Sequence, residues 1–342
     1  MTSLNHREIV YILEANGVSG GVKNVFEHIN HLHDMGYRVH LFSLDNHPRW
    51  FPLKVQTRRF KNYQKMLQQL KVMDAIKVAT WWNTLDTVVN SCDPLQNGRG
   101  IPFYLVQDIE ESYYPHSPEM RARVHQTYQK NINYLTVADW TTQQLAQRFQ
   151  KQAANVSIAI DHDVFRPNRT HDYDPLRILA CSRRSQHLKG FHVTAEAVQK
   201  VHQMLSNVSL VTFGLESPNI PRIPALHFSV PDDRTVAYLY ANCGVFVQTS
   251  YHEGFGMPIL EAMACGAPVV TTRANGNEEF CIDGHNCLMV NSGDADGVAN
   301  AIYRVLTDRE LANYLAANAI QTAQKYNWPR VMSNLTSEFS KY

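Results

Sequence analysis

Residues 250–272 read SYHEGFGMPILEAMACGAPVVTT and join two short apolar runs, GVFVQTS and APVVTTR. These runs have the length and the β-branched content of buried strands. Gly254 and Gly256 free the backbone to turn tightly between them, and Pro258 fits the first turn of a helix, where no N–H partner is lost. The stretch therefore predicts a strand, a glycine turn, a helix and a second strand, with the start of the helix facing a cleft.

The same alternation of strand and helix extends outward from this stretch. Apolar runs of strand length form two series, separated by the Pro- and Asp-rich piece FRPNRTHDYDPL. Strands that alternate with helices are typical of parallel sheets, and 342 residues exceed what one hydrophobic core usually supports. The sequence predicts an α/β protein with two Rossmann-like domains, whose parallel sheets face each other across a ligand-binding cleft.

The expected strands set the domain limits. They are EIVYILEA, YRVHLFSL, AIKVATWW, IPFYLVQD, NYLTVAD and NVSIAI in the first series, and LRILACS, SLVTFG, ALHFSV, GVFVQTS, APVVTTR and NCLMV in the second. We expect a first domain over 1–165, a second over 166–325 and a linker near 163–175. A last helical segment, 326–342, is expected to pack back on the first domain.

The composition argues against several classes of partner and environment. Lysine plus arginine (32) nearly balance aspartate plus glutamate (31), so no global field favours nucleic acid. The six cysteines form no CxxC pair, which favours a reducing cytoplasm over a disulfide framework or a zinc site. The amino-terminal residues show no export signal, and no run of eighteen apolar residues occurs, so we expect no membrane span.

The central stretch carries groups suited to a sugar diphosphate. A helix N-terminus presents unpaired N–H groups and a partial positive charge, which favour a diphosphate. Glu253, in the glycine turn, can accept hydrogen bonds from sugar hydroxyls. Glu261 lies farther along the same helix, with seven residues between the two glutamates.

The segment EGFGMPILEAMACGAPVV resembles the signature of the retaining glycosyltransferases of family 4, which have two Rossmann-like domains in the GT-B arrangement. The resemblance extends over most of the chain. It implies that Glu253 lies beside the donor sugar and that Glu261 contacts the nucleotide ribose, while Gly254, Phe255 and Gly256 line the same loop. It also implies transfer with retention of configuration and without a metal ion or another cofactor.

A second segment, LRILACSRRSQHLKGF, is a predicted strand that ends at a basic turn. It resembles the arginine and lysine pair that holds the donor diphosphate in that family, with Lys189 as the lysine. Arg184 lies five residues earlier, while Arg183 lies nearer the strand end, and both stay candidates for the arginine. Fixed cations at this place would stabilise the leaving diphosphate without a metal ion. The alternative is a solvated basic turn.

The first half has weaker signals of the same kind. Gly20 and Gly21, in EANGVSGGVKN, resemble the amino-terminal glycine loop of the family, and GVSGGV lacks the GxGxxG spacing of a dinucleotide-binding turn. The strand IPFYLV is followed by Gln107 and Asp108 where family members often carry His-Asp. A glutamine cannot take a proton, so Gln107 would only position the sugar, leaving Asp108 or Glu110 for the acceptor. Asp108 could equally cap a helix.

Aromatic residues suggest where an acceptor would bind. Trp81 and Trp82, with Tyr113 and Tyr114, are candidates for acceptor contacts, and core packing is an equal alternative. Gly276 to Glu278 resemble a later donor loop of the family.

Two other clusters have simpler explanations. Asp161 to Asp163 read DHD after an apolar run, as does a metal-binding motif of another glycosyltransferase class, but the motif lies where we expect the linker. His28, His31 and His33 lie in one predicted helix, but only His28 and His31 share a face and no third ligand is evident, which favours a solvated face.

Residues 54–73 contain six basic and no acidic side chains, with Phe60, Tyr63, Leu67 and Leu70 at helical spacing. This pattern predicts a helix, and two uses for it stay open. It is either a peripheral membrane contact at the inner face or a surface helix whose apolar stripe packs on the core.

Together these features predict a cytoplasmic glycosyltransferase that moves a hexosyl or deoxyhexosyl group from a nucleoside-diphosphate sugar to a glycan, lipid-linked or small-molecule acceptor. A UDP donor is favoured, with GDP and dTDP as alternatives. Two other functions remain open: a noncatalytic subunit that binds nucleotide sugar or glycan, and a phosphorylase or epimerase of the same architecture.

Overall fold

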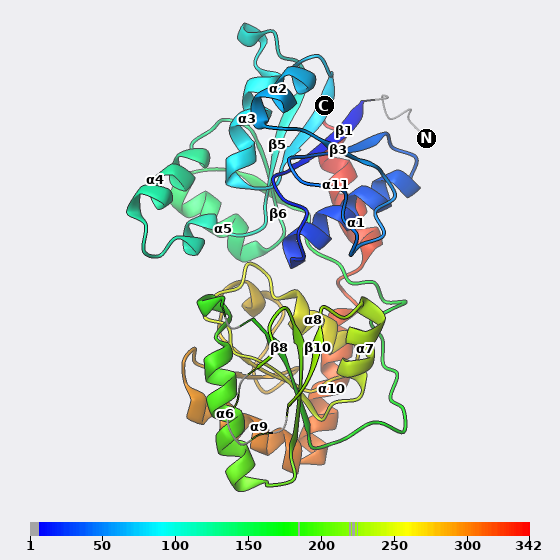
Figure 1. Cartoon of the computed structure of the whole chain (residues 1–342), viewed down its shortest axis with the longest axis vertical. Helices are drawn as coiled ribbons and strands as arrows, with labels where there is room; N and C mark the ends of the chain where they lie inside the picture. The colour runs from blue at the N-terminus through cyan, green and yellow to red at the C-terminus, as the bar shows by residue number, and fades with distance from the viewer. Residues whose placement is uncertain (1–6, 184, 219, 221–222, 224) are drawn as a thin grey trace. The chain divides into compact units, whose positions relative to one another are not determined.

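The computed structural model describes residues 7–183, 185–218, 220, 223 and 225–342. The chain forms two compact units. Unit 1 contains the residues up to Ile158 together with Trp328–Tyr342, and unit 2 contains Ala159–Asn327. Each unit has one parallel sheet with helices packed on it (Figure 1), so the predicted α/β fold with two Rossmann-like domains is confirmed. The division falls after residue 158, whereas the sequence placed it after 165.

The sheet of unit 1 has the strand order β3-β2-β1-β4-β5-β6-β7, and its neighbouring strands run parallel. Its strands are β1 (Glu8–Leu13), β2 (Val39–Ser43), β3 (Thr57–Arg59), β4 (Ala75–Ala79), β5 (Ile101–Val106), β6 (Asn133–Thr136) and β7 (Ala153–Asn155). Its helices are α1 (Gly20–Asp34), α2 (Tyr63–Lys71), α3 (Trp82–Cys92), η1 (Pro94–Gln96), η2 (Glu110–Tyr113), α4 (Pro118–Thr127), α5 (Asp139–Phe149) and α11 (Trp328–Phe339), where η marks a 3₁₀ turn.

The sheet of unit 2 has the order β10-β9-β8-β11-β12-β13 and is also parallel. Its strands are β8 (Arg177–Ser182), β9 (Ser209–Gly214), β10 (Ala225–Ser229), β11 (Val245–Gln248), β12 (Val269–Thr272) and β13 (Leu288–Val290). Its helices are η3 (His187–Lys189), α6 (Phe191–Met204), α7 (Asp233–Ala241), α8 (Met257–Ala264), η4 (Gly276–Glu279), α9 (Ala295–Thr307) and α10 (Arg309–Ala323).

The central strands are apolar because helices bury both of their faces. All four residues of β11 and all four of β12 are buried, and Ile9 to Leu13 are buried in β1. Such continuous apolar runs are typical of parallel sheets. In unit 2, α6 packs beside α9, and α8 beside α10 (Figure 1). In both sheets the order reverses beside the first strand, β1 or β8, and such a switch point is where open α/β sheets usually bind ligands.

The predicted helix over 54–73 is wrong in its first part. Thr57–Arg59 pair with β2 as an edge strand, and α2 begins only at Tyr63, after the Asn62 side chain caps it. The apolar side chains of the helix point inward, with Met66 and Leu70 fully buried in the core of unit 1. The apolar face of this helix therefore packs on the core of unit 1.

The last predicted strand of the first series was also misplaced. NVSIAI was expected to form it, but β7 covers Ala153–Asn155, and no strand begins in residues 156–160. Ser157 has a φ of 67°, which breaks an extended backbone there. No helix in the described part of the chain is both long and apolar enough to cross a membrane.

Helix α11 belongs to unit 1 and packs beside α1 (Figure 1). The Trp328 ring stacks on His31 with centroids 4.4 Å apart, and it meets the edge of His28 at 6.0 Å. His28 is completely buried, and burial lowers its pKa to about 3. The prediction that these histidines form a solvated face is therefore wrong for His28, because α11 covers it.

Candidate functional site

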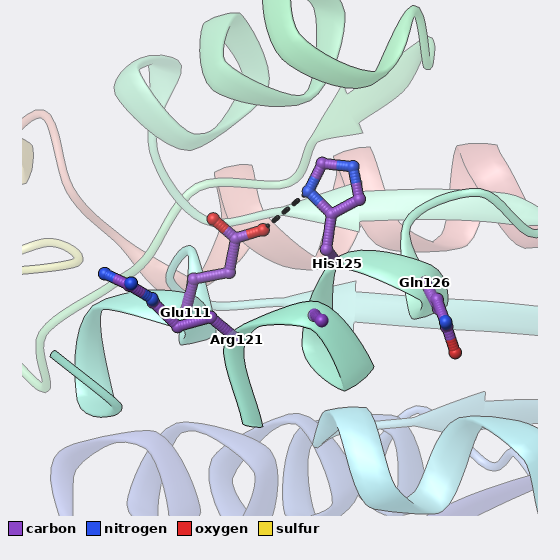
Figure 2. A pocket seen from close by; sticks show the side chains of 5 residues that line it. Glu111, Arg121, His125 and Gln126 are labelled. Carbon is purple, nitrogen blue, oxygen red and sulfur yellow. Dashed lines mark hydrogen bonds and ion pairs between the residues drawn. The ribbon is translucent and has the colours of Figure 1, made fainter. Parts of the chain in front are cut away.

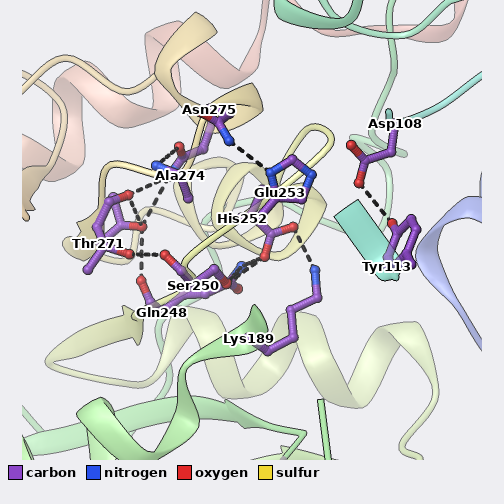
Figure 3. Close-up of polar contacts among 12 residues, drawn as sticks. Asp108, Tyr113, Lys189, Gln248, Ser250, His252, Glu253, Thr271, Ala274 and Asn275 are labelled. Carbon is purple, nitrogen blue, oxygen red and sulfur yellow. Dashed lines mark hydrogen bonds and ion pairs between the residues drawn. The ribbon is translucent and has the colours of Figure 1, made fainter. Parts of the chain in front are cut away.

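Three loops of unit 2 meet at the carboxyl edge of its parallel sheet. The first follows β8 and carries the basic turn into α6; the second follows β11 and leads into α8; the third follows β12 and contains η4. Neighbouring parallel strands end at the same edge, so these loops lie together although up to about ninety residues separate them in the sequence. Figure 3 shows their polar side chains in contact.

The Glu253 carboxylate is the centre of this cluster. Its Oε2 accepts a bond from Lys189 Nζ at 2.8 Å, and its Oε1 accepts from Gln248 Nε2 at 2.7 Å and Ser250 Oγ at 2.6 Å (Figure 3). Glu253 is 5% exposed. Burial alone would raise its pKa, but the Lys189 charge and the hydrogen bonds outweigh that effect and lower it. The site thus holds a buried, ionised carboxylate against one cation.

Two glycines let the loops approach each other backbone to backbone. Gly190 ends η3 with a φ of 62°, and a Cβ there would lie 1.9 Å from the Thr249 carbonyl oxygen. A Cβ on Gly276 would lie 2.2 Å from the Gly254 carbonyl oxygen. These contacts fix Lys189 and the η4 loop against the loop that carries Glu253.

The start of α8 is built as the sequence predicted. Gly256 is its N-cap with a φ of 103°, Pro258 lies in the first turn, and no side chain caps the helix. Phe255 turns inward and packs on Phe280 and Tyr326, with centroids 5.1 and 5.6 Å away, so it anchors the loop from inside. Pro258 has no N–H group, and the Ile259 N–H donates to the Gly256 carbonyl at 3.0 Å, so the favourable term for an anion here is mainly the partial positive charge of the helix N-terminus.

Glu261 lies one turn farther along α8 and is 8% exposed. It lies close to the buried hydroxyl of Tyr240, whose pKa is raised by burial and by the Glu261 charge. The Tyr240 hydroxyl has no hydrogen-bond partner in the described part of the chain.

Two more buried polar atoms at this edge lack partners among the described residues: Ser182 Oγ, at the end of β8, and Gln248 Oε1, at the end of β11. Buried polar groups are nearly always hydrogen-bonded in native proteins, so such atoms at strand ends are candidates for ligand contacts.

The basic turn after β8 is described in part. Arg184 lies outside the described residues. Arg183 is half-buried, and its carbonyl accepts a bond from Gln186 N at 3.2 Å. Burial raises the pKa of the Cys181 thiol, and the charges of Arg183 and Lys189 oppose that rise, so both cations lie near the end of β8.

In unit 1, Gly20 and Gly21 begin α1 after the Ser19 cap. The Gln107 side chain, just after β5, donates to the Gly21 carbonyl at 3.1 Å and accepts from Asn24 at 3.1 Å. Gln107 therefore fixes the first turn of α1, and the glycine pair leaves room for it, since a Cβ on Gly21 would lie 3.2 Å from Gln107 Nε2.

The residues after Gln107 form a buried polar turn. Asp108 is 5% exposed; its carboxylate accepts from the Ile109 N–H at 2.7 Å and the Tyr113 hydroxyl at 2.9 Å. It thus holds the η2 turn in the manner of a cap. The Tyr113 ring lies 5.6 Å from the half-buried ring of Trp81.

Glu110 and Trp82 lie in the interior of unit 1, at 2% and 8% exposure, although both were predicted as acceptor contacts. Glu110 Oε2 accepts from the Trp82 N–H at 2.9 Å and the Tyr104 hydroxyl at 2.5 Å. Burial raises the pKa of Glu110 to about 8. Trp82 Nε1 donates to the Tyr114 hydroxyl at 3.1 Å. Core packing explains both residues, whereas the Trp81 ring is half-buried against that core.

A hollow of about 530 Å³ on unit 1 was not expected from the sequence. It is lined by Glu111, Arg121, Ala122, His125 and Gln126 (Figure 2). Glu111 accepts from His125 Nδ1 at 2.9 Å and pairs with Arg148. The hollow is open and wide, with its acid already paired.

The DHD motif builds a turn. Asp161 Oδ1 accepts from the Asp163 N–H at 2.9 Å, and His162 Nε2 lies 3.0 Å from the Tyr326 carbonyl. Across the described residues, no three histidine, cysteine, aspartate or glutamate side chains are grouped as ligands for a metal ion.

The architecture, two parallel-sheet Rossmann-like domains, is that of the GT-B glycosyltransferases. The solved structure of HepE from Anabaena in complex with UDP-glucose has a TM-score of 0.82, with 16% identity, over 98% of this chain and 100% of HepE. Sucrose-phosphate synthase from Thermosynechococcus elongatus has a TM-score of 0.78, with 18% identity, over 98% of each chain.

The family match lies within unit 2. Residues 163–322 match the family model of the glycosyl transferases group 1. The lipopolysaccharide core biosynthesis glycosyltransferase LpsE of Rhizobium meliloti is 38% identical over 39% of this chain and 41% of its own length. The D-inositol 3-phosphate glycosyltransferase of Stackebrandtia nassauensis is 28% identical over 53% and 46%. The chain thus spans less than half the length of these curated relatives.

Sequence reasoning missed the side chains that complete the cluster, Gln248, Ser250, His252 and Asn275. Polar residues at the end of an apolar strand, as in FVQTS, are a usable signal. Asn275 becomes part of the site only through the fold, because its loop follows a different strand.

Proposed function

We propose that this chain is a glycosyltransferase that moves a sugar from a nucleoside-diphosphate donor to an acceptor hydroxyl, with retention of configuration and without a metal ion. The observation that carries the proposal is the ion pair of the partly exposed Lys189 with the buried Glu253, beside the start of α8 at the carboxyl edge of the sheet. A cation, a helix N-terminus and a carboxylate within one site suit a sugar diphosphate. The match to the group 1 model covers the same residues.

Each group has a role in this proposal. Lys189, with Arg183 or Arg184, stabilises the negative charge that grows on the diphosphate as the bond to the sugar breaks. When the diphosphate attracts Lys189, the Glu253 carboxylate accepts bonds from sugar hydroxyls in its place, still held by Gln248 and Ser250. Glu261 binds the ribose.

In unit 1, the α1 start at Gly20 and Gly21 supplies N–H groups to the donor phosphates. Asp108, which is 5% exposed, and the half-buried Trp81 are the acceptor-side candidates. The acceptor hydroxyl transfers its proton to the departing phosphate or to a nearby carboxylate. Gln107 only positions the sugar, since an amide takes no proton.

UDP is the favoured nucleotide, with GDP and dTDP as alternatives, because HepE was solved with UDP-glucose and with UDP. A hexosyl or deoxyhexosyl group is the expected cargo. A glycan or lipid-linked acceptor is favoured by the names of relatives in lipopolysaccharide core and O-antigen synthesis. A phosphorylase or an epimerase would use the same anion-binding groups for a different reaction. Analysis of the products distinguishes these two activities from glycosyl transfer.

A panel of UDP-, GDP- and dTDP-sugars, with and without chelator, tests the proposal by nucleotide release. Slow hydrolysis of one donor that survives chelation and weakens in Glu261→Ala supports it. Release that chelator abolishes contradicts the metal-independent step. Nucleotide binding without release, also in the presence of candidate acceptors, favours the noncatalytic subunit.

Peripheral membrane contact through residues 54–73 stays a hypothesis that rests on charge, because the apolar side chains Met66 and Leu70 are buried. Of the six basic residues, Lys54 pairs with Asp34, and Arg58 bonds Gln69. Sedimentation with anionic liposomes tests it, and failure to bind at low salt would rule it out.

A further inference from the structure

Three neighbouring strands of unit 1 end side by side. The strands β1, β4 and β5 are adjacent and parallel, and the switch point of the sheet lies between β1 and β4. Glu14 follows β1, and Tyr113 ends the η2 turn that follows β5. Trp81 is the N-cap residue of α3, after β4, and Asn83 lies in the first turn of that helix. Open α/β sheets bind ligands at such a place, so these four side chains are candidates for ligand contacts.

Tyr113 is a large aromatic residue that the fold holds in place and leaves partly open. It is 47% exposed. Its ring lies 5.6 Å from that of the half-buried Trp81, at a tilt of 52°, and its hydroxyl donates to Asp108 at 2.9 Å (Figure 3). An aromatic face carries partial negative charge, which attracts the slightly positive C–H groups on the apolar side of a pyranose ring.

Buried bonds fix the two segments that carry these rings. Glu110, in η2, accepts from the Trp82 N–H at 2.9 Å, and Trp82 Nε1 donates to the Tyr114 hydroxyl at 3.1 Å. The η2 turn is therefore tied to the start of α3 next to the contact between Trp81 and Tyr113. A ligand meets a preorganised pair of rings, and little ordering of side chains opposes its binding.

Glu14 adds a carboxylate at the same edge. It is half-buried, and Asn83 Nδ2 donates to its two oxygens at 3.2 and 3.1 Å. Burial and the Glu14 charge raise the pKa of Tyr63, so the Tyr63 hydroxyl lies nearby. No lysine or arginine of the described residues pairs with Glu14, whereas Glu253 meets Lys189. A carboxylate that an amide orients and no cation neutralises suits the hydroxyl groups of a neutral ligand.

We propose that the ends of β1, β4 and β5 form an acceptor subsite for a neutral pyranose, whose ring stacks on Tyr113 beside Trp81 and whose hydroxyl donates to Glu14. The inference rests on the proposed function, because it names the acceptor class of the same enzyme. The aromatic pair binds the C–H face of the sugar, and the carboxylate binds its hydroxyls. The Glu14 charge disfavours a phosphate or a carboxylate on the same sugar.

Saturation-transfer NMR tests the stacking contact on the full chain, without a nucleotide sugar. The probes are methyl glucoside, methyl galactoside, methyl mannoside and UDP. At least one pyranoside should bind, with the strongest transfer to the C–H hydrogens of one ring face. Tyr113→Ala should weaken its binding about tenfold, the size of one aromatic contact. Tyr113→Phe keeps the ring and should retain most of the binding.

The matched control is Tyr314→Ala, which removes a tyrosine on α10 that is 52% exposed and should leave sugar binding unchanged. The subsite is overturned if no pyranoside binds to wild type, or if Tyr113→Ala binds it as tightly as wild type does. A signal that depends on Tyr113 and comes from UDP but from none of the sugars would also overturn it, since the ring would then stack on a base.

The role of Glu14 is tested with the uronic acid analogue of the pyranoside that binds. Wild type should bind this anion more weakly than the neutral sugar, and Glu14→Gln should narrow the difference because it removes the negative charge. Glu310→Gln, at an exposed position of unit 2, should keep the wild-type preference. An equal preference in wild type and Glu14→Gln would overturn the assignment of Glu14.

The donor panel separates a failure of this inference from a failure of the proposed function. If nucleotide is released from a donor while no pyranoside binds, the transferase proposal stands and the acceptor subsite fails. If a pyranoside binds through Tyr113 while no nucleotide sugar is bound or hydrolysed, the sugar subsite stands and the proposed transferase fails.

Discussion

At the scale of single residues, the buried carboxylates of the two units have opposite electrostatics. Glu253 meets a lysine and is ionised, whereas Glu110 meets only hydroxyl and amide donors and the nearby Asp108 charge, which favours its protonated form. The charge and the hydrogen bonds around each buried carboxylate thus decide which form is favoured, the ionised one for Glu253 and the protonated one for Glu110.

The first prediction concerns Lys189→Ala. This change leaves the Glu253 carboxylate buried without its cation, so the Glu253 pKa should rise. The free energy of unfolding at pH 7 should fall by about 2 kcal/mol. The loss is smaller than for a fully enclosed pair because the Lys189 side chain is 31% exposed. Because the pKa of Glu253 is lowered in the folded wild type, the stability that the ion pair contributes is present above about pH 4.5. It is lost as the pH falls through the folded-state pKa of Glu253. Urea unfolding of both proteins at pH 7 and pH 3 measures it; an equal difference at both values would contradict the account.

The second prediction concerns Glu110→Gln. The raised pKa means that Glu110 stabilises the fold fully below about pH 4.5, and that this stability is lost by about 1.4 kcal/mol per pH unit up to about pH 8. The glutamine oxygen can accept the bonds from Trp82 and Tyr104 and does not titrate. The variant should therefore gain stability relative to wild type between pH 5 and 8 in thermal unfolding. A constant difference across that range would show that Glu110 does not titrate there.

At the scale of elements, Gly190 links η3 and α6 to the loop after β11. Gly190→Ala should cost at least about 2 kcal/mol, because the methyl group meets the Thr249 carbonyl and the φ is left-handed. Gly284 has a similar φ of 71° with open space around it, so Gly284→Ala should cost only about 1 kcal/mol. Chemical denaturation compares the two, and equal losses would show that the backbone contact does not matter.

Elements with long apolar runs were predictable from the sequence, and those fixed by neighbours were not. The strands of unit 2 lie where LRILACS to NCLMV predicted them, because helices bury both faces of the central ones. Strand β3 was missed because Thr57–Arg59 are polar edge residues that extend only by pairing with β2. Burial of His28 was missed because α11, from the far end of the sequence, covers it.

The candidate site shows the same limit. Glu253, Glu261, Lys189 and the glycines could be named from their spacing and from the family they resemble. The partners Gln248 and Asn275 could not, because three separate loops bring them together. Glu110 and Trp82 were candidates for acceptor contacts, and a sequence does not show that their side chains bond Tyr104 and Tyr114 in the interior.

At the scale of the whole molecule, the last helix, α11, completes the core of unit 1. Phe339 is 4% exposed, with its ring 5.1 Å from Phe103 in β5. Phe339→Ala should destabilise unit 1 by about 3–5 kcal/mol. Hydrogen exchange should then quicken in β5 and α1 while unit 2 is unchanged. Ile302→Ala, in the core of unit 2, is the reciprocal control. Loss of protection in both units from either change would contradict two separate cores.

The central claim is that the Lys189–Glu253 site transfers sugar from a nucleotide donor. The most direct test is the rate of nucleotide release from the preferred donor, with chelator present, in wild type, Lys189→Ala and the surface control Lys200→Ala. The account predicts that Lys189→Ala lowers the rate by about a hundredfold or more, since it removes a cation from the leaving group, while Lys200→Ala matches wild type. Equal rates in wild type and Lys189→Ala, or no release from any donor, would contradict it.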